Sequence, residues 1–296
     1  MSQSLTLDLI TYDPGMPGAG ALEFAVEVIS KVEQSWSSGA DLVVLPEFIW
    51  LGLSPHLAYT SSEPLRDLAE YFWKELMPKL QEHFSISGKA VILGTVPCVL
   101  PDSQIRNRSV IFANGRIFHQ DKLHLTPWEN AFSPGEQLLV WQFLGFRMAV
   151  VICLDIEIPE LSARLRDCGL DLILCPSATE TILGVERVNR CASARAVELG
   201  CYVGVSHLIG RADCELIDEN VGLAAIYRPS QSAFRHQPRN EQTELHTSGS
   251  QTLRVVLERK PLEAMRRMIS ETNPSHLGKK MAGFQRCIHI ESLDQT

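Results

Sequence analysis

Residues 149–160 read A-V-V-I-C-L-D-I-E-I-P-E, and this stretch determines the fold prediction. Residues 148–152 form an apolar run, which is typical of a strand buried on both faces. Helix signals follow at once: acidic residues, then Pro159 at a first helical position. Cys153 therefore lies at the corner where a buried strand ends and a helix begins.

Cys153 has two interpretations when it is considered alone. A thiol at a strand-to-helix corner can be exposed at the carboxyl end of the sheet, where α/β folds tend to bind ligands. The alternative is a packed core residue, because free cysteine is among the most buried residue types. Only other residues of the chain can decide between the two interpretations.

The composition indicates an ordinary globular chain. The sequence has 296 residues, of which 45% are hydrophobic and 21% charged, so it can bury a sizeable core. A formal net charge of −8 argues against binding to nucleic acid or to an acidic membrane surface. We expect a single domain over residues 1–296, with a core at about 5–270 and a tail at 271–296.

Localisation is predicted from the N-terminus and the cysteines. The first residues, M-S-Q-S-L-T-L-D-L-I, lack the charged and apolar regions of a secretory signal, and no apolar run is long enough to span a bilayer. The eight cysteines are scattered and contain no C-x-x-C pair. We therefore expect reduced thiols without a zinc site and a cytoplasmic protein.

The hydrophobic pattern alternates between strands and helices. Asn114-Gly115 and Leu144-Gly145 each separate two strands and predict hairpins. Residues 231–250 are polar and predict the one long linker. The expected strands are 5–12, 41–45, 90–96, 109–113, 116–118, 138–143, 146–152, 170–175, 202–206, 223–227 and 252–257, and the expected helices are 21–36, 64–84, 157–168, 186–199 and 261–270. This order predicts an α/β domain with mixed sheets and helices outside.

Three residues that can carry chemistry occupy the same kind of position. Glu47, Lys122 and Cys153 each follow the end of a predicted strand, so they can converge on one rim. A thiol of pKa ~8.5 needs a base or a positive charge nearby to become a nucleophile. A carboxylate can take that proton and return it to a leaving amine, and an ammonium can stabilise a developing oxyanion. The trio therefore favours nucleophilic catalysis.

The chain resembles members of the nitrilase (carbon–nitrogen hydrolase) superfamily, whose signature is Glu, Lys and Cys in that order. Three segments carry the resemblance: V-V-L-P-E-F at 43–48, Q-D-K-L-H-L-T-P-W-E at 120–129, and V-I-C-L-D-I-E-I-P-E at 151–160. Residues 107–116, 132–135, 187–198 and 222–229 support it. The resemblance extends over about residues 5–270.

The resemblance implies a role for each matching residue. Cys153 is the nucleophile, Glu47 the general base and acid, Lys122 the oxyanion-stabilising cation, and Glu129 the second glutamate that orients the lysine or the substrate. The backbone N–H of Leu154 completes the oxyanion hole. The implied fold is a four-layer α-β-β-α sandwich of two mixed sheets, with no metal or organic cofactor and with homodimers or higher homo-oligomers.

The branch of the superfamily is indicated less directly. The cysteine segment and residues 179–196 are similar to uncharacterised amidohydrolases, some of which are fused to N-acetyltransferase domains that this chain has no room for. Leu154 departs from the tyrosine usual in those relatives. True nitrilases tend to have Trp-Glu after the cysteine, and carbamoylases often have arginines there; the residues that follow Cys153 here match neither.

Further residues are candidates for binding the substrate. Trp128 lies inside the lysine motif, and Ser177, Thr179 and Glu180 follow a predicted strand that ends at the same rim. Arg195 and Glu198 are spaced as a structural ion pair. We expect hydrolysis of a small carboxamide through a thioester. Nitrile or N-carbamoyl hydrolysis in the same site, and a non-catalytic scaffold, are the alternatives.

Overall fold

The computed structural model describes residues 4–15, 20–58 and 62–267. The predicted tail at 271–296 and the last residues of the predicted helix 261–270 lie outside this description. Two six-stranded sheets contain the twelve strands found in these described ranges. Both sheets are mixed, since each holds a parallel core of three strands flanked by antiparallel strands.

The first sheet has the strand order β12-β1-β2-β3-β4-β5. Strands β1, β2 and β3 are parallel to one another, and β4 and β5 follow as antiparallel neighbours. The C-terminal strand β12 pairs with β1 and closes the opposite edge. The strand bounds are β1 Ser4–Ile10, β2 Leu42–Leu45, β3 Ala90–Val99, β4 Ile105–Ala113, β5 Arg116–Asp121 and β12 Thr252–Glu258.

The second sheet has the order β11-β10-β9-β8-β7-β6. Its parallel core is β7, β8 and β9, so each sheet repeats the same arrangement around a central parallel strand. The strand bounds are β6 Val140–Phe143, β7 Phe146–Val150, β8 Leu172–Ser177, β9 Tyr202–His207, β10 Ala224–Tyr227 and β11 Asn240–Gln242.

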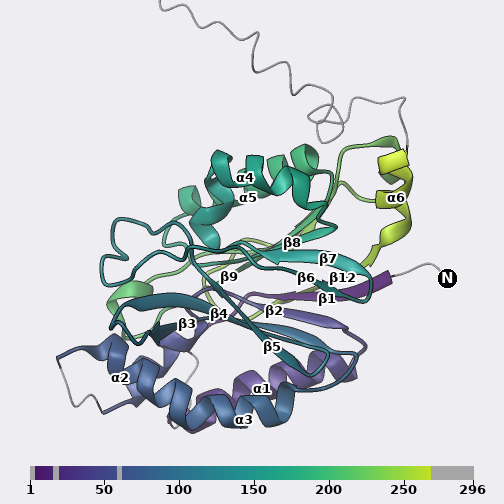
Figure 1. Cartoon of the computed structure of the whole chain (residues 1–296). Helices are drawn as coiled ribbons and strands as arrows, with labels where there is room; N and C mark the ends of the chain where they lie inside the picture. The colour runs from purple at the N-terminus through teal and green to yellow at the C-terminus, as the bar shows by residue number, and fades with distance from the viewer. Residues whose placement is uncertain (1–3, 16–19, 59–61, 268–296) are drawn as a thin grey trace, which may run out of the picture.

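The two sheets pack face to face between two layers of helices (Figure 1). Helices α1 (Ala21–Ser37), α2 (Pro64–Tyr71) and α3 (Met77–Phe84) cover the first sheet, and α4 (Pro159–Leu165) and α5 (Ile182–Leu199) cover the second. The expected four-layer sandwich of two mixed sheets is therefore confirmed.

Alternation along the strands assigns the two faces of the first sheet. In β2, Leu42 and Val44 belong to the core between the sheets, whereas Val43 and Leu45 pack beneath the outer helices. A strand with both faces buried reads as a continuous apolar run, and its period of two distributes the side chains between two separate cores. The same rule explains the apolar run that leads to Cys153.

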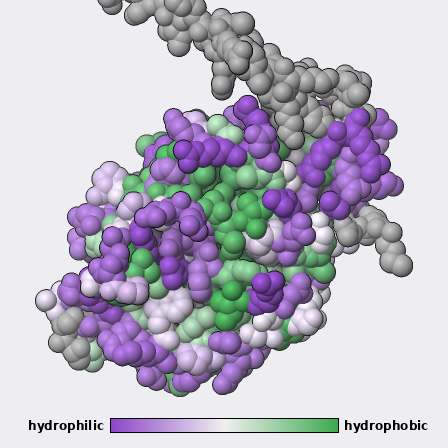
Figure 2. Space-filling view, viewed as in Figure 1, coloured by the Kyte–Doolittle hydropathy of each residue, from purple (hydrophilic) through white to green (hydrophobic). Residues whose placement is uncertain are grey.

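Helix α6 (Arg259–Arg267) follows β12 at the edge of the sandwich. Its outward surface is hydrophilic, whereas hydrophobic surface in the same view gathers over the middle of the molecule, where the sheets lie (Figure 2). Arg266 donates to the buried carboxylate of Asp171 at 2.6 Å, which fixes the helix to the second sheet. None of the described helices combines the length and the apolar character that a bilayer crossing requires.

The predicted helical segment 64–84 is confirmed, but a π-helical turn, Phe72–Leu76, divides it into α2 and α3. Pro78 lacks the N–H that would continue the hydrogen-bond ladder, so the turn widens before α3 begins. The polar residues 231–250 are not a plain linker, because strand β11 within them pairs with β10.

Both predicted hairpins are present. Asn114 and Gly115 connect β4 to β5, and Leu144 and Gly145 connect β6 to β7, all four with positive φ. Two left-handed residues in a row match the right-handed twist of the flanking strands. The first hairpin is important for the candidate site because its second strand, β5, ends at residue 121, directly before Lys122.

Gly94 allows β3 to approach the residue that precedes Glu47. Its φ is +62°, and a Cβ atom there would lie 1.9 Å from the backbone oxygen of Pro46. The register between β3 and β4 shifts at this point, which marks a local bulge. Only glycine satisfies both the left-handed conformation and the close backbone contact.

We therefore predict that Gly94→Ala destabilises the fold more than Gly88→Ala. Gly88 also has a positive φ of +76° but has no atom within 4 Å of the position a Cβ would take. Strain alone at Gly88 should cost about 1–2 kcal/mol, and the added clash at Gly94 should cost more than about 3 kcal/mol. Chemical denaturation measures both free energies of unfolding, and equal losses would contradict this role for Gly94.

Candidate active site

Cys153 begins a 3-10 turn, Cys153–Glu157, just beyond the end of β7. Its φ is 47°, a left-handed conformation that non-glycine residues rarely adopt. The thiol is buried and donates to the carbonyl oxygen of Ala178 at 3.5 Å. The α-helix starts only at Pro159, so the turn separates Cys153 from the helix that the sequence placed directly after it.

Leu154 occupies the second position of the same turn. N–H groups in the first turn of a helix have no carbonyl partner within the helix, so they are available to an oxygen outside it. Leu154 also lines the cavity at Cys153. Its backbone thus lies where an oxyanion donor is expected, whatever its side chain.

Glu47 lies just beyond β2 and is almost fully buried, with a relative exposure of 1%. Its Oε2 accepts from the backbone N–H of Ala178 at 3.1 Å. Phe48, the next residue, has a φ of 60°, and its N–H donates to the hydroxyl of Thr95 at 2.8 Å. Left-handed backbone thus occurs at Cys153 itself and at Phe48, the residue directly after Glu47.

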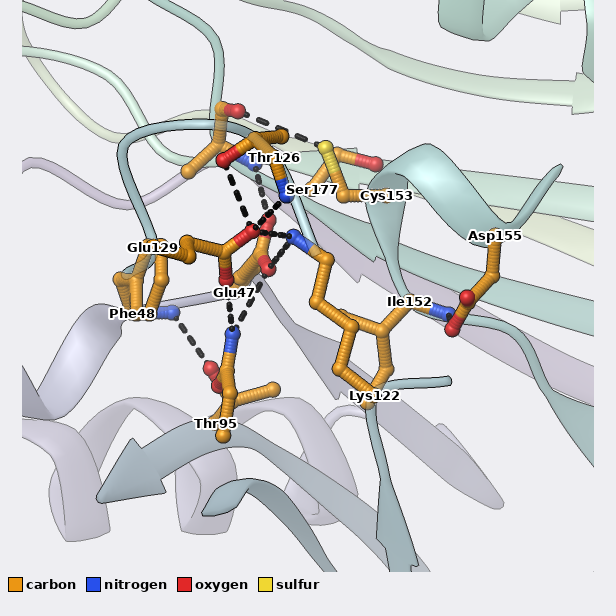
Figure 3. Close-up of polar contacts among 12 residues, drawn as sticks. Glu47, Phe48, Thr95, Lys122, Thr126, Glu129, Ile152, Cys153, Asp155 and Ser177 are labelled. Atoms are coloured by element: carbon orange, nitrogen blue, oxygen red, sulfur yellow. Dashed lines mark hydrogen bonds and ion pairs between the residues drawn. The ribbon is translucent and has the colours of Figure 1, made fainter. Parts of the chain in front are cut away.

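The Lys122 ammonium lies between two carboxylates (Figure 3). Its Nζ is 2.8 Å from Oε1 of Glu47 and 2.7 Å from Oε2 of Glu129. All three side chains are at most 1% exposed. Buried ionised groups require this kind of mutual pairing, because each one alone would carry a large desolvation cost.

Asn107 completes the same cluster from strand β4. Its side-chain amide donates to Oε1 of Glu47 at 2.9 Å and to Oε1 of Glu129 at 3.1 Å. Thr126 donates to Glu129 from both its backbone N–H and its hydroxyl. In the sequence, Asn107 is only the first residue of the supporting segment 107–116. The structure shows that its amide bridges the two glutamates.

The cluster contains one more carboxylate than ammonium groups, and the pKa of Glu47 responds to this excess. Burial raises the pKa of Glu47 to about 7, the charge of Lys122 opposes the shift, and Glu129 adds to it. Burial disfavours the Lys122 ammonium, but Glu47, Cys153 and Glu129 outweigh that effect and raise its pKa. Lys122 therefore stays charged near neutral pH, whereas Glu47 changes its protonation state there.

The Cys153 thiol is neutral in the resting site. Burial first, and then the charge of Glu47, raise the pKa of Cys153 well above its ordinary value, while Lys122 opposes them. The Lys122 ammonium already pairs with two carboxylates, so it stabilises a Cys153 thiolate less than an unpaired ammonium would. A nucleophilic reaction at Cys153 requires proton transfer to a base as it proceeds, and Glu47 is the neighbouring carboxylate.

These groups open into a cavity of about 310 Å³. Four predicted substrate-binding residues, Trp128, Leu154, Thr179 and Glu180, line this cavity together with the predicted catalytic residues. The remaining lining residues are Phe48, Thr126, Pro127, Glu157, Ala178, Thr181, Gly184, Arg187, Leu216 and Asn220.

Ser177 is the one predicted binding residue that the structure does not place on this cavity. It is fully buried at the end of β8, and its hydroxyl donates to the carbonyl oxygen of Cys175. Strand β8 ends at Ser177, and the cavity is lined by the residues that follow, Ala178 and Thr179, while the Ser177 hydroxyl is engaged by its own strand. The predicted pair of Arg195 and Glu198 is confirmed as an ion pair at 2.9 Å.

Asp155 is a site residue that sequence reasoning missed. It is buried, and its carboxylate accepts from the backbone N–H groups of Leu123 at 3.1 Å and His124 at 2.7 Å, and lies 2.8 Å from the His124 ring. It thereby ties the segment after Lys122 to the turn of Cys153. The sequence showed only an acidic residue in a first helical turn, which is usually a solvated N-terminal charge.

The carboxylates of the site are paired with protein donors. Among residues 4–15, 20–58 and 62–267, no group of three or more His, Cys, Asp or Glu side chains is arranged to hold a metal ion. The carboxylates that such an ion would need are instead occupied by Lys122 and Asn107. The arrangement joins a nucleophile, a base of suitable pKa and a fixed cation, which suits acyl transfer.

Comparison with known proteins now assigns the family. The family model described as carbon-nitrogen hydrolase matches residues 19–248. The chain belongs to the carbon–nitrogen hydrolase family. Solved structures share the fold: an amidase from Nesterenkonia sp. has a TM-score of 0.68 at 18% identity over 95% of this chain and 97% of its own. The NitFhit protein of C. elegans has a TM-score of 0.70 at 20% identity, over 90% of this chain and 64% of its own.

Curated relatives of this carbon–nitrogen hydrolase carry hydrolase and amidase names. The probable hydrolase YhcX of Bacillus subtilis is 32% identical over 72% of this chain and 42% of its own length. An (R)-stereoselective amidase from Pseudomonas sp. is 28% identical over 60% of this chain and 62% of its own. The chain therefore spans about two fifths to three fifths of these relatives.

We predict that Asp155→Asn weakens both the fold and the site. The asparagine amide would replace one carboxylate oxygen with an NH₂ donor, which cannot accept from the N–H groups of Leu123 and His124. The free energy of unfolding should therefore fall by about 2–3 kcal/mol. The rate of any turnover should also fall, because Lys122 and Cys153 lose their common anchor. Asp167→Asn, which changes an exposed carboxylate of the 3-10 turn Arg166–Cys168, is the matched control. Equal behaviour of the two variants in denaturation and activity assays would contradict the role of Asp155.

Proposed function

We propose that this carbon–nitrogen hydrolase is an amidase that hydrolyses a small carboxamide through a thioester on Cys153. One observation carries the proposal: a buried thiol and the raised-pKa carboxylate of Glu47 meet at Ala178 beside the fixed ammonium of Lys122. This arrangement provides a nucleophile, a proton carrier and an oxyanion donor in one cavity. Membership of the family sets the reaction class as attack on a carbon–nitrogen bond.

The first half-reaction forms the acyl-enzyme. Ionised Glu47 takes the thiol proton while Sγ of Cys153 bonds to the amide carbon, giving a tetrahedral intermediate with a negative oxygen. Glu47 then delivers that proton to the nitrogen as the C–N bond breaks, and ammonia or an amine leaves. The thioester remains on Cys153, and Glu47 is again ionised.

The second half-reaction releases the acid. Glu47 takes a proton from a water molecule whose oxygen bonds to the thioester carbon, and a second tetrahedral intermediate forms. The C–S bond then breaks, and the proton returns from Glu47 to the sulfur of Cys153. A carboxylic acid leaves, and the site regains its starting protonation state.

Lys122 and the Leu154 N–H are the proposed oxyanion donors in both halves. Contacts with Glu47 and Glu129 hold the Lys122 ammonium in place, so little reorganisation is needed when charge develops on the substrate oxygen. Glu129 acts through Lys122 and is a positioning residue. Each donor of this kind typically contributes ~3 kcal/mol to transition-state stabilisation.

The names of relatives favour an amide over the alternatives. One solved structure of the Nesterenkonia amidase is a double mutant, in which a glutamate and a cysteine are replaced, in complex with acrylamide. Omega-amidase and deaminated glutathione amidase are also among the curated relatives. The same residues can attack a nitrile or an N-carbamoyl carbon, but no contact in the cavity favours either. The homodimer and the cytoplasmic location stay predictions, which light scattering and cell fractionation test.

Replacement of the nucleophile is the first test of this function. On a carboxamide that the wild-type protein hydrolyses, Cys153→Ala should lower kcat by about 10⁴-fold or more, as removal of a nucleophile usually does. Cys191→Ala, on helix α5 away from the cavity, is the matched control and should retain activity. Substantial turnover by Cys153→Ala would overturn the assignment of the nucleophile.

The pH profile tests the role of Glu47 separately. Because Glu47 must be ionised to accept the thiol proton, kcat/KM should rise with pH through a midpoint near 7. Glu129→Gln removes a negative charge that raises the pKa of Glu47, so the midpoint should move to lower pH. Glu82→Gln, an exposed carboxylate on α3, should leave the midpoint unchanged. A shift to higher pH in Glu129→Gln would contradict the assignment.

A further inference from the structure

A second cavity, of about 670 Å³, adjoins the catalytic cavity. The two cavities share Trp128, Glu180 and Leu216 as lining residues, so these side chains stand between them. A substrate whose carboxamide reaches Cys153 and that is longer than the catalytic cavity can therefore extend past Trp128 toward the outer cavity. The outer cavity is the space available to the part of the substrate that lies away from the reacting bond.

The walls of the outer cavity are largely apolar. The Trp128 side chain is 56% exposed, although tryptophan side chains are highly buried on average. It presents a ring to both cavities. The other apolar lining residues of the outer cavity are Pro64, Leu65, Ala131, Phe132 and Leu216. Such walls suit an aliphatic or aromatic chain, which they remove from water.

The charged residues that line the outer cavity are all acidic. Glu180, Asp213 and Glu215 line the outer cavity, and none of its lining residues is Lys, Arg or His. The two cations of the catalytic cavity, Lys122 and Arg187, do not line the outer cavity. Lys122 is held by the buried carboxylates, and Arg187 lies 3.3 Å from Glu157. A carboxylate in the outer cavity thus meets acidic side chains and no lining cation.

We propose that the outer cavity is the subsite for the distal end of the substrate and that this end carries an alkylammonium group. Trp128 would contact the chain or cover the cation with its ring, and Glu180 and its acidic neighbours would pair with the charge. This inference rests on the proposed function, because it names the substrate class of the same site. It makes Trp128 and Glu180 specificity-determining residues.

The test uses three primary carboxamides of equal length that end in a methyl, a carboxylate or an ammonium group. We expect kcat/KM to be highest for the ammonium amide and lowest for the carboxylate amide. The difference should shrink as salt is added, because exposed charges are screened. Glu180→Gln should lower the ratio of ammonium to methyl amide by about fivefold, the upper range for an exposed ion pair.

Glu82→Gln is the matched control, because it removes an equal charge on α3 outside both cavities and should leave the ratio unaltered. Trp128→Leu is the second variant and should lower kcat/KM for the ammonium amide more than for a short amide that ends inside the catalytic cavity. A preference for the carboxylate amide, or an equal rate for all three, would overturn the inference while leaving the proposed function intact. Absence of hydrolysis of every amide would reject both.

Discussion

The ammonium of Lys122, buried between Glu47 and Glu129, is the interaction on which the rest of the site depends. The two carboxylates reach Lys122 because strands β2 and β5 end at the same rim of the first sheet. Glu47 follows β2, Lys122 follows β5, and Glu129 lies in the loop after Lys122. One cation cannot neutralise two carboxylates, so burial leaves an excess charge that a proton on Glu47 can relieve. The acid–base property proposed for catalysis thus follows from a structural constraint.

Each sheet contributes a different part of the proposed reaction. The first sheet supplies the base and the cation, and the second supplies the nucleophile after β7 and the Ala178 backbone after β8. Burial of the apolar side chains between the two sheets therefore also brings the reacting groups together. Asp155 adds a polar connection between the Lys122 segment and the Cys153 turn, so the two halves do not depend on packing alone.

Strand ends were predictable from the sequence because apolar runs and hairpin turns mark them clearly, and these ends located Glu47, Lys122 and Cys153. The contacts of Asn107 and Asp155 were not predictable, since an isolated polar residue does not reveal its partner. Ser177 is the last residue of β8, but its hydroxyl donates to Cys175 of its own strand and its side chain does not line the cavity. Position along the chain thus predicts which elements meet, and not which side chain each presents.

The most direct measurement of the account is mass spectrometry of the protein after its reaction with a carboxamide is quenched in acid. The account predicts an added mass equal to the acyl group, located on the peptide that contains Cys153, and no such adduct in Cys153→Ala. The adduct should form more slowly below pH 7, where Glu47 is protonated. Steady turnover without an acyl group on Cys153, or an acyl group on another residue that persists in Cys153→Ala, would contradict the account.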